Sequence, residues 1–162
     1  MVAKYSDAEI AQLLTESKIL PPRFLTWPKM KERTGHKERD LPVTGADGNE
    51  FKLILRQSNF NPLDFSIILA FRPPGTNQLF RLMRFNGKSH QHTNKLERVS
   101  FYDFHIHTAT ERYQEIGTRE DAYAERTDRY SDYYGALQCM LSDCNFEITD
   151  GGQQILFKES RS

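Results

Sequence analysis

Hydrophobic and polar residues alternate along much of the chain between residues 41 and 85. Alternation with a period of two is typical of strands that bury one face, since successive side chains point to opposite sides. The pattern predicts strands at residues 41–45, 49–57, 63–72 and 78–85. Clusters of turn-forming residues separate them, among them Ala46-Asp47-Gly48 and residues 73–77. These short connections predict an antiparallel meander.

Helical patterns flank this region. Ser6 followed by Glu9 forms a capping box, and the pattern that it opens predicts a helix over residues 6–18, ended by Pro21-Pro22. Residues 118–121 resemble the cap of a helix, or of two broken helices, that reaches about residue 143. Tyrosines and leucines at helical spacing predict its buried face: Tyr123, Tyr130, Tyr134, Leu137 and Leu141. Residues 146–149 and 153–157 predict a terminal hairpin.

Together these elements predict a single α+β domain over residues 1–162. An antiparallel meander sheet of about five strands packs the N-terminal helix and the C-terminal Tyr-rich helix on one face. The terminal hairpin either extends the sheet or caps the helix. Two polar stretches stay outside this scheme: residues 23–40 predict a basic loop with at most one short helix, and residues 88–100 predict an exposed loop.

Composition indicates where such a domain works. No apolar run approaches 18 residues, so no membrane span and no membrane partner are expected, and the first residues lack the apolar core of a secretory signal. Cys139 and Cys144 lie five residues apart in a helical pattern, which suits neither a disulfide nor a zinc knuckle. They predict two small buried side chains in a reducing cytoplasm.

The net charge of zero hides an asymmetry between the two parts of the chain. Residues 1–98 carry 16 Lys and Arg against 10 Asp and Glu, whereas residues 99–162 carry 6 against 12. A basic patch attracts nucleic acid or another polyanion. Equally, the two parts can pair inside one domain, and the overall neutrality favours this pairing.

The segment with most candidate chemistry is residues 101–110, which predict a strand. Asp103, His105 and His107 fall on one face of it. Histidines at i and i+2 reach one metal ion, and a carboxylate is a suitable third ligand. However, Asp103 and His107 are about 13–14 Å apart at the backbone, so one ion needs a further group. It would come from a neighbouring strand or from the loop that holds His90 and His92.

The same histidines also suit catalysis without a metal. His105 and His107 would act as acid and base in a ribonuclease or toxin, supported by Arg112 and Tyr113. A cationic face of the sheet would then hold phosphate or nucleic acid. Its candidate residues are Lys52, Arg56, Arg72, Arg81 and Arg84.

A purely structural interpretation ranks above both enzymes. Asp103, His105 and Arg112 would satisfy one another, while acidic residues after residue 110 neutralise the arginines of the sheet. This interpretation requires no cofactor. It predicts a non-enzymatic interaction protein whose partner is a protein or a nucleic acid.

Residues 79–90 and 104–114, which include R-F-N-G-K-S-H and F-H-I-H-T-A-T-E-R-Y-Q, resemble a family of small bacterial and phage proteins of unknown function. The resemblance implies a small cytoplasmic protein of bacteria, in the setting of mobile elements or phage defence. Toxins, antitoxins and inhibitors are common in that setting, which is compatible with both the ribonuclease and the interaction protein. It assigns no role to any residue.

Overall fold

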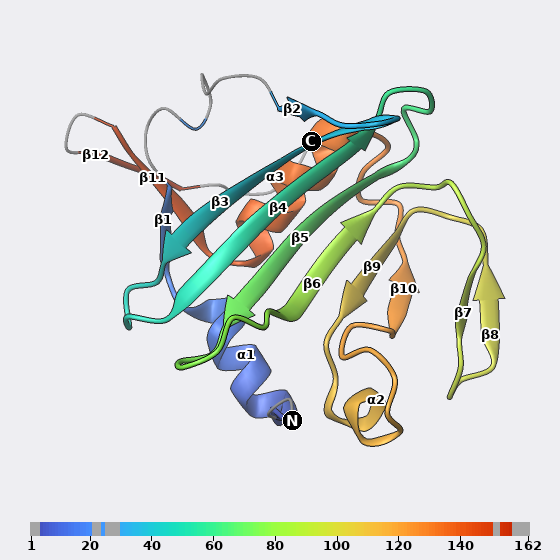
Figure 1. Ribbon diagram of the computed structural model, residues 1–162, viewed down its shortest axis with the longest axis horizontal. Coiled ribbons are helices and arrows are strands. Elements are labelled where there is room, and N and C mark those ends of the chain that lie inside the picture. Colours follow the sequence, from blue (N-terminus) through green and yellow to red (C-terminus); the bar gives the residue numbers. More distant parts are fainter. Residues whose placement is uncertain (1–3, 21–23, 25–29, 151–152, 157–162) are drawn as a thin grey trace.

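The computed structural model describes residues 4–20, 24, 30–150 and 153–156. Within them, seven strands form an antiparallel sheet in the order β10-β9-β6-β5-β4-β3-β2 (Figure 1). Consecutive hairpins join β3 to β6, so the predicted meander and the α+β class are confirmed, with more strands than the sequence indicated. The strands of this sheet are β2 Lys31–Glu32, β3 His36–Thr44, β4 Glu50–Ser58, β5 Phe65–Arg72, β6 Phe80–Asn86, β9 His105–Thr108 and β10 Ala124–Arg126.

One face of the sheet forms the hydrophobic core. Phe51, Leu53 and Leu55 of β4 are buried on it, as the alternation predicts. Helix α3, Tyr133–Asp143, lies across this face (Figure 1) and buries Ala136 and Met140 against it. The opposite face carries no helix at its centre in Figure 1, and this open face holds the residues considered below.

The C-terminal helix is shorter than predicted. It begins at Tyr133, where the Asp132 side chain accepts a hydrogen bond from the backbone N–H of Gly135. A helix from residue 118 is wrong: residues 118–123 form a loop, and β10 follows, paired with β9. Tyr130 is buried, but from the loop before the helix. Tyr123 lies in the loop before β10 and Tyr134 is 73% exposed, so these two positions are not on the predicted buried face.

The N-terminal helix α1, Asp7–Thr15, has the predicted capping box of Ser6 and Glu9. Ile10 and Leu13 belong to the core. After the helix, the Lys18 ammonium group is fully buried and donates hydrogen bonds to the backbone carbonyls of Leu13, Leu14, Glu16 and Cys144. Lys18 thus satisfies carbonyls at the end of the helix that have no partner inside it.

The predicted terminal hairpin is present as β11, Phe146–Asp150, and β12, Gln153–Leu156. It neither extends the large sheet nor caps the helix. Instead, β1, Lys18–Leu20, pairs with β11 in parallel, so that in the described residues a second sheet has the order β1-β11-β12. The segment after α1 and the C-terminal hairpin thereby belong to one sheet.

Two segments that were predicted to be loops contain strands. Residues 88–100 include the hairpin of β7, His92–Asn94, and β8, Val99–Phe101. It stands beside β9 and β10 at the edge of the molecule in Figure 1. Residues 102–104 separate β8 from β9, so the predicted strand over residues 101–110 is divided in two. The basic segment 23–40 provides β2 and the first part of β3, and residues 23 and 25–29 lie outside the described part.

Two further expectations concern composition. Among the described residues, no helix is both long enough and apolar enough to cross a membrane. Cys139 and Cys144 are buried and are not joined in a disulfide, as predicted.

Helix α2, Glu111–Glu115, begins at Thr110, whose hydroxyl accepts a hydrogen bond from the backbone N–H of Tyr113.

Candidate metal centre

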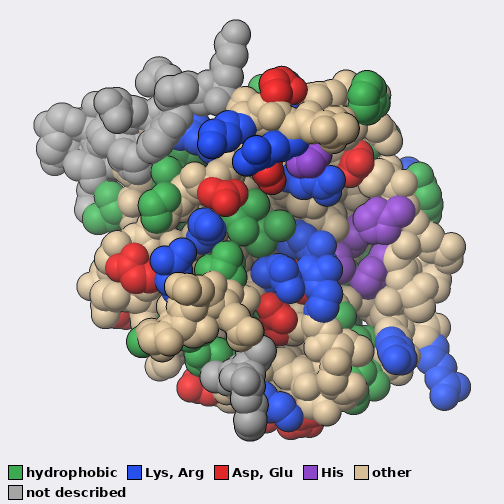
Figure 2. Space-filling view, viewed as in Figure 1, with side chains coloured by type: hydrophobic (Ala, Val, Ile, Leu, Met, Phe, Trp, Pro, Cys, Tyr) green, Lys and Arg blue, Asp and Glu red, His purple; other side chains and the backbone are tan. Residues whose placement is uncertain are grey.

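The open face of the sheet is defined by its register, because residues directly opposite one another in antiparallel strands share a face. One row across β4, β5, β6 and β9 consists of Ile54, Ile68, Arg84 and His107. The next row consists of Arg56, Ser66, Asn86 and His105. His105 and His107 therefore share the open face, as the alternation predicted. In Figure 2, histidine side chains lie next to a group of Lys and Arg side chains on this face.

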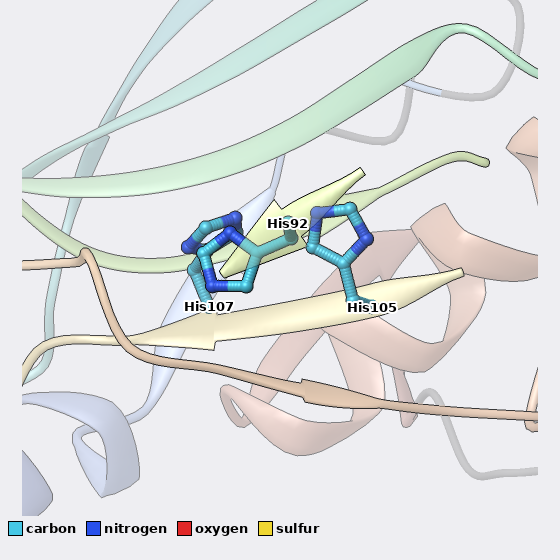
Figure 3. Close-up of side chains that lie close together, drawn as sticks. All are labelled: His92, His105 and His107. Atoms are coloured by element: carbon cyan, nitrogen blue, oxygen red, sulfur yellow. The ribbon is translucent and has the colours of Figure 1, made fainter. Parts of the chain in front are cut away.

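A third imidazole joins them from the β7–β8 hairpin. Of the described residues, His92, His105 and His107 form a group in which one ring nitrogen of each lies within 4.8 Å of the others. The three side chains converge from β7 and β9 in Figure 3. Ring centroids are 4.9 Å apart for His92 and His107, 5.1 Å for His105 and His107, and 5.3 Å for His92 and His105.

Hydrogen bonds fix the tautomers of the two strand histidines. Nδ1 of His105 lies 2.7 Å from the carbonyl oxygen of Asp103, and Nδ1 of His107 lies 2.7 Å from that of Asp121. A carbonyl oxygen only accepts, so in both rings Nδ1 carries the hydrogen and Nε2 carries the lone pair. For His105, the Asn86 amide makes a long 3.5 Å contact to Nε2. For His107, no described residue makes a hydrogen bond to Nε2. The lone pair of His107 therefore has no partner among the described residues, and that of His105 accepts only the long contact from Asn86.

Asn94 fixes the third ring. Its Nδ2 donates to the Ala124 carbonyl oxygen over 2.7 Å, and its Oδ1 accepts from the Ala124 N–H over 2.9 Å. Oδ1 also lies 2.8 Å from Nε2 of His92. Because Oδ1 only accepts, Nε2 of His92 carries the hydrogen, and Nδ1 carries the lone pair. Asn94 therefore attaches the hairpin to β10 and orients His92 at the same time.

Burial keeps these rings neutral. His105 and His107 are 0% and 4% exposed. Removal from water lowers the pKa of His105 to about 4. The same cause, together with the positive charge of Arg84, lowers the pKa of His107 to about 2. Near pH 7 both rings are uncharged, which is the form that binds a metal ion and a poor form for a general acid.

Asp103 and the other residues predicted to act with His105 and His107 lie elsewhere. The Asp103 carboxylate is next to Arg126 at 2.9 Å and Lys88 at 3.9 Å, and it is outside the group of three rings. Its backbone carbonyl, not its side chain, contacts His105. In place of the Asp103 carboxylate, the structure brings the ring of His92 to the two strand histidines.

Arg112 and Tyr113 hold the tip of the hairpin. The Tyr113 hydroxyl donates to the Glu97 carboxylate and accepts from the Leu96 N–H, and Arg112 forms an ion pair with Glu97. The Arg112 guanidinium also lies over the ring of Tyr123, 5.0 Å from its centroid. These contacts position the segment that carries His92. The predicted pairing of Asp103, His105 and Arg112 with one another is absent from the described contacts.

An arginine cluster lies next to the histidines. The buried Asp121 carboxylate is 3.3 Å from Arg84 Nε, 3.7 Å from Arg81 Nε and 3.4 Å from Arg119 Nε. Glu120 is 3.6 Å from Arg81. The predicted neutralisation of the sheet by later acidic residues is thus present in part, from a loop and not from a helix.

The remaining basic candidates are more scattered. Lys52 lies opposite Ala70, which lies opposite Arg81, so both bases are on the open face. Arg56 is exposed on the same face, whereas Lys52 is 3.4 Å from Asp40. Arg72 is exposed at the far end of β5, opposite Glu50. Arg81 and Arg84 are therefore the two predicted anion-binding residues that lie near the histidines.

Comparison of the chain with family models, with curated proteins and with solved structures finds no match. A fold by itself does not define an activity, since one architecture carries many sites. The function is therefore inferred from the chemistry of this centre.

Proposed function

We propose that this protein is a metal-dependent enzyme whose ion is bound by His92, His105 and His107. One observation carries the proposal: three imidazoles, each with its lone pair fixed by a hydrogen bond at the other nitrogen, converge with ring nitrogens within 4.8 Å. This set differs from the one predicted by sequence in a single member, since His92 replaces Asp103.

The geometry suits a transition metal. In a tetrahedral zinc site with bonds of about 2.0–2.1 Å, neighbouring nitrogens are about 3.3–3.4 Å apart. The ring nitrogens of the three histidines lie within 4.8 Å of one another, so the side chains need a modest inward shift to reach this spacing. Imidazole suits zinc, copper, nickel and iron, and hydrogen bonds from the second ring nitrogen are the usual support of a metal-binding histidine.

Three protein ligands are typical of catalytic sites, because they leave a coordination position for water or substrate. An ion bound in this way supplies Lewis acidity and lowers the pKa of a coordinated water. The protein itself contributes three things: carbonyls that hold two of the rings, a hairpin that covers them, and the positive charge of Arg84 at one side.

The test measures metal content, metal affinity and stability on purified protein. After removal of metal with a chelator and addition of zinc, elemental analysis is expected to find about one ion per chain. At zinc near 1,000 times its dissociation constant, the protein gains about 4 kcal/mol. For a domain of this size that gain raises the melting temperature by about 8–16 °C.

Single His→Gln variants at positions 92, 105 and 107 are expected to lose zinc binding and the zinc-dependent rise in melting temperature. His36→Gln is the matched control, because His36 lies at the start of β3, near the opposite edge of the sheet, outside the group of three rings. Wild-type protein that folds but takes up no more metal than His105→Gln refutes the proposal.

The same samples separate the metal proposal from the predictions made from sequence. RNA cleavage that continues in EDTA and is lost in His105→Gln supports a metal-independent nuclease. A wild-type protein that takes up no zinc, does not cleave RNA and captures a partner as well as the His105→Gln variant does supports the interaction protein. Either result excludes the metal-dependent enzyme.

A further inference from the structure

Arg84 is a largely buried basic residue that makes no side-chain hydrogen bond to the described residues. It lies directly opposite His107 across the β6–β9 pair, and its side chain is 17% exposed. Its Nε is buried without a hydrogen-bond partner. Among the described residues, its terminal nitrogens make no hydrogen bond either. A guanidinium has five N–H donors, so Arg84 has donors available to a ligand that accepts hydrogen bonds.

Asp121 forms an ion pair with the Arg84 guanidinium group but does not accept a hydrogen bond from it. The carboxylate is fully buried and is surrounded by Arg81, Arg84 and Arg119 at 3.3–3.7 Å. Neither carboxylate oxygen has a hydrogen-bond partner among the described residues, so the attraction is one of charge. Asp121 therefore gathers three arginines and leaves N–H groups available to another acceptor.

The charge balance of the cluster is positive. Three guanidinium groups face two carboxylates, those of Glu120 and Asp121. The excess positive charge lies beside His107, since Arg84 is directly opposite it across the β6–β9 pair. Next to a metal ion, this charge disfavours another cation and favours an anionic ligand.

We propose that the ligand of this centre is a phosphate ester, whose phosphoryl oxygens are bound by Arg84 with support from Arg81 and Arg119. The inference deepens the proposed function and depends on it for the metal. Guanidinium groups bind phosphoryl oxygens through paired charge-assisted hydrogen bonds, and arginine with a metal ion is the usual combination for phosphoryl groups. A tetrahedral anion with several oxygens can accept from donors that come from different directions, which a planar carboxylate does less well.

The open face gives such a ligand a way to approach. Lys52 lies in the same row across the strands as Arg81. Ile54 lies in the row of Arg84, and the exposed Arg56 is two positions beyond Ile54 on β4. Figure 2 shows a group of Lys and Arg side chains beside histidine on this face. These outer bases attract the ester by long-range charge, whereas Arg84 contacts it.

The experiment titrates phenyl phosphate, diphenyl phosphate and benzoate into zinc-loaded and metal-free protein by calorimetry. One of the two phosphate esters is expected to bind the zinc-loaded protein, and benzoate more weakly. Arg84→Gln is expected to weaken ester binding by about 10- to 100-fold, since it removes a charged donor pair. Arg84→Lys keeps the positive charge but loses the paired N–H donors of the guanidinium group. Its affinity for the ester is expected to lie between those of wild type and Arg84→Gln.

Arg33→Gln is the matched control, because Arg33 precedes β3 at the opposite edge of the sheet and makes the same change of charge. Metal content and melting temperature of each variant show whether it is folded and loaded. Equal binding of the tighter-binding ester by wild type and Arg84→Gln, or binding of neither ester more tightly than benzoate, overturns the inference. If the wild type binds no zinc but binds an ester through Arg84, the anion site stands and the metal proposal alone fails.

Discussion

Replacing Asn94 by alanine tests whether one buried amide both attaches the β7–β8 hairpin and orients a metal ligand. Asn94 is 5% exposed. It makes two hydrogen bonds to the backbone of Ala124 and one to the ring of His92. The substitution removes all three, and it leaves the N–H and carbonyl of Ala124 without their partner in a residue that is 1% exposed.

The magnitude follows from these losses. A buried polar group left without a partner costs about 1–3 kcal/mol. Two such groups at Ala124, which water reaches in part because β10 is an edge strand, are expected to reduce the free energy of unfolding by about 2–4 kcal/mol. Loss of a hydrogen bond that supports a metal-binding histidine typically lowers metal affinity by about 10- to 100-fold.

Two assays on metal-free and zinc-loaded protein separate the effects. Urea unfolding of the metal-free protein measures the structural loss, and competition with a coloured chelator measures zinc affinity. Thr93→Ala is the control, because Thr93 is the neighbour of Asn94 on β7 and its hydroxyl makes an exposed hydrogen bond to Ser100. If Asn94→Ala changes zinc affinity no more than Thr93→Ala, the role of Asn94 in orienting His92 is refuted.

Three further predictions concern the metal-free protein. The pKa values of His105 and His107, about 4 and about 2, lie below the ordinary 6.5, so the unfolded chain takes up protons before the folded protein as the pH falls. The free energy of unfolding, measured by urea titration, is expected to be full above about pH 6.5 and to drop by on the order of 3 kcal/mol for each ring by pH 4. A profile that does not change with pH contradicts this. Lys18→Met is expected to lose about 3 kcal/mol or more of unfolding free energy, because four backbone carbonyls lose a buried donor, and an unchanged urea midpoint excludes that role. Tyr113→Phe removes the hydroxyl that holds the hairpin tip and is expected to speed tryptic cleavage there, so an unaltered cleavage rate contradicts the proposed attachment.

The meander could be predicted because its information is local. Strands β3 to β6 are long, buried and more exposed positions alternate over much of their length, and short turns connect them. Such turns fix the register, and the register fixes which side chains share a face. Placing His105 and His107 together on the open face of the sheet needed only this alternation.

The hairpin that completes the centre could not be predicted in the same way. Its two strands have three residues each, and most of their side chains are polar. Its position depends on contacts distant in sequence, those of Asn94 with Ala124 and those of Glu97 with Arg112 and Tyr113. The H-x-H of residues 90–92 was the only signal for His92, and a pair of histidines in a polar stretch is common without a metal.

The charge asymmetry of the chain was interpreted as a neutralised interface, and Asp121 explains why that interpretation was incomplete. Its carboxylate attracts Arg81 and Arg84 of the open face and Arg119 of the adjoining loop, as neutralisation requires. Its backbone carbonyl holds Nδ1 of His107, so the same residue fixes a metal ligand. Glu120 and Asp121 leave one of the three guanidinium charges unbalanced, and Arg84 lies directly opposite His107. A single residue thereby joins the proposed metal centre to the proposed anion site, which is why acidic residues in the second part of the chain are compatible with a phosphate ligand.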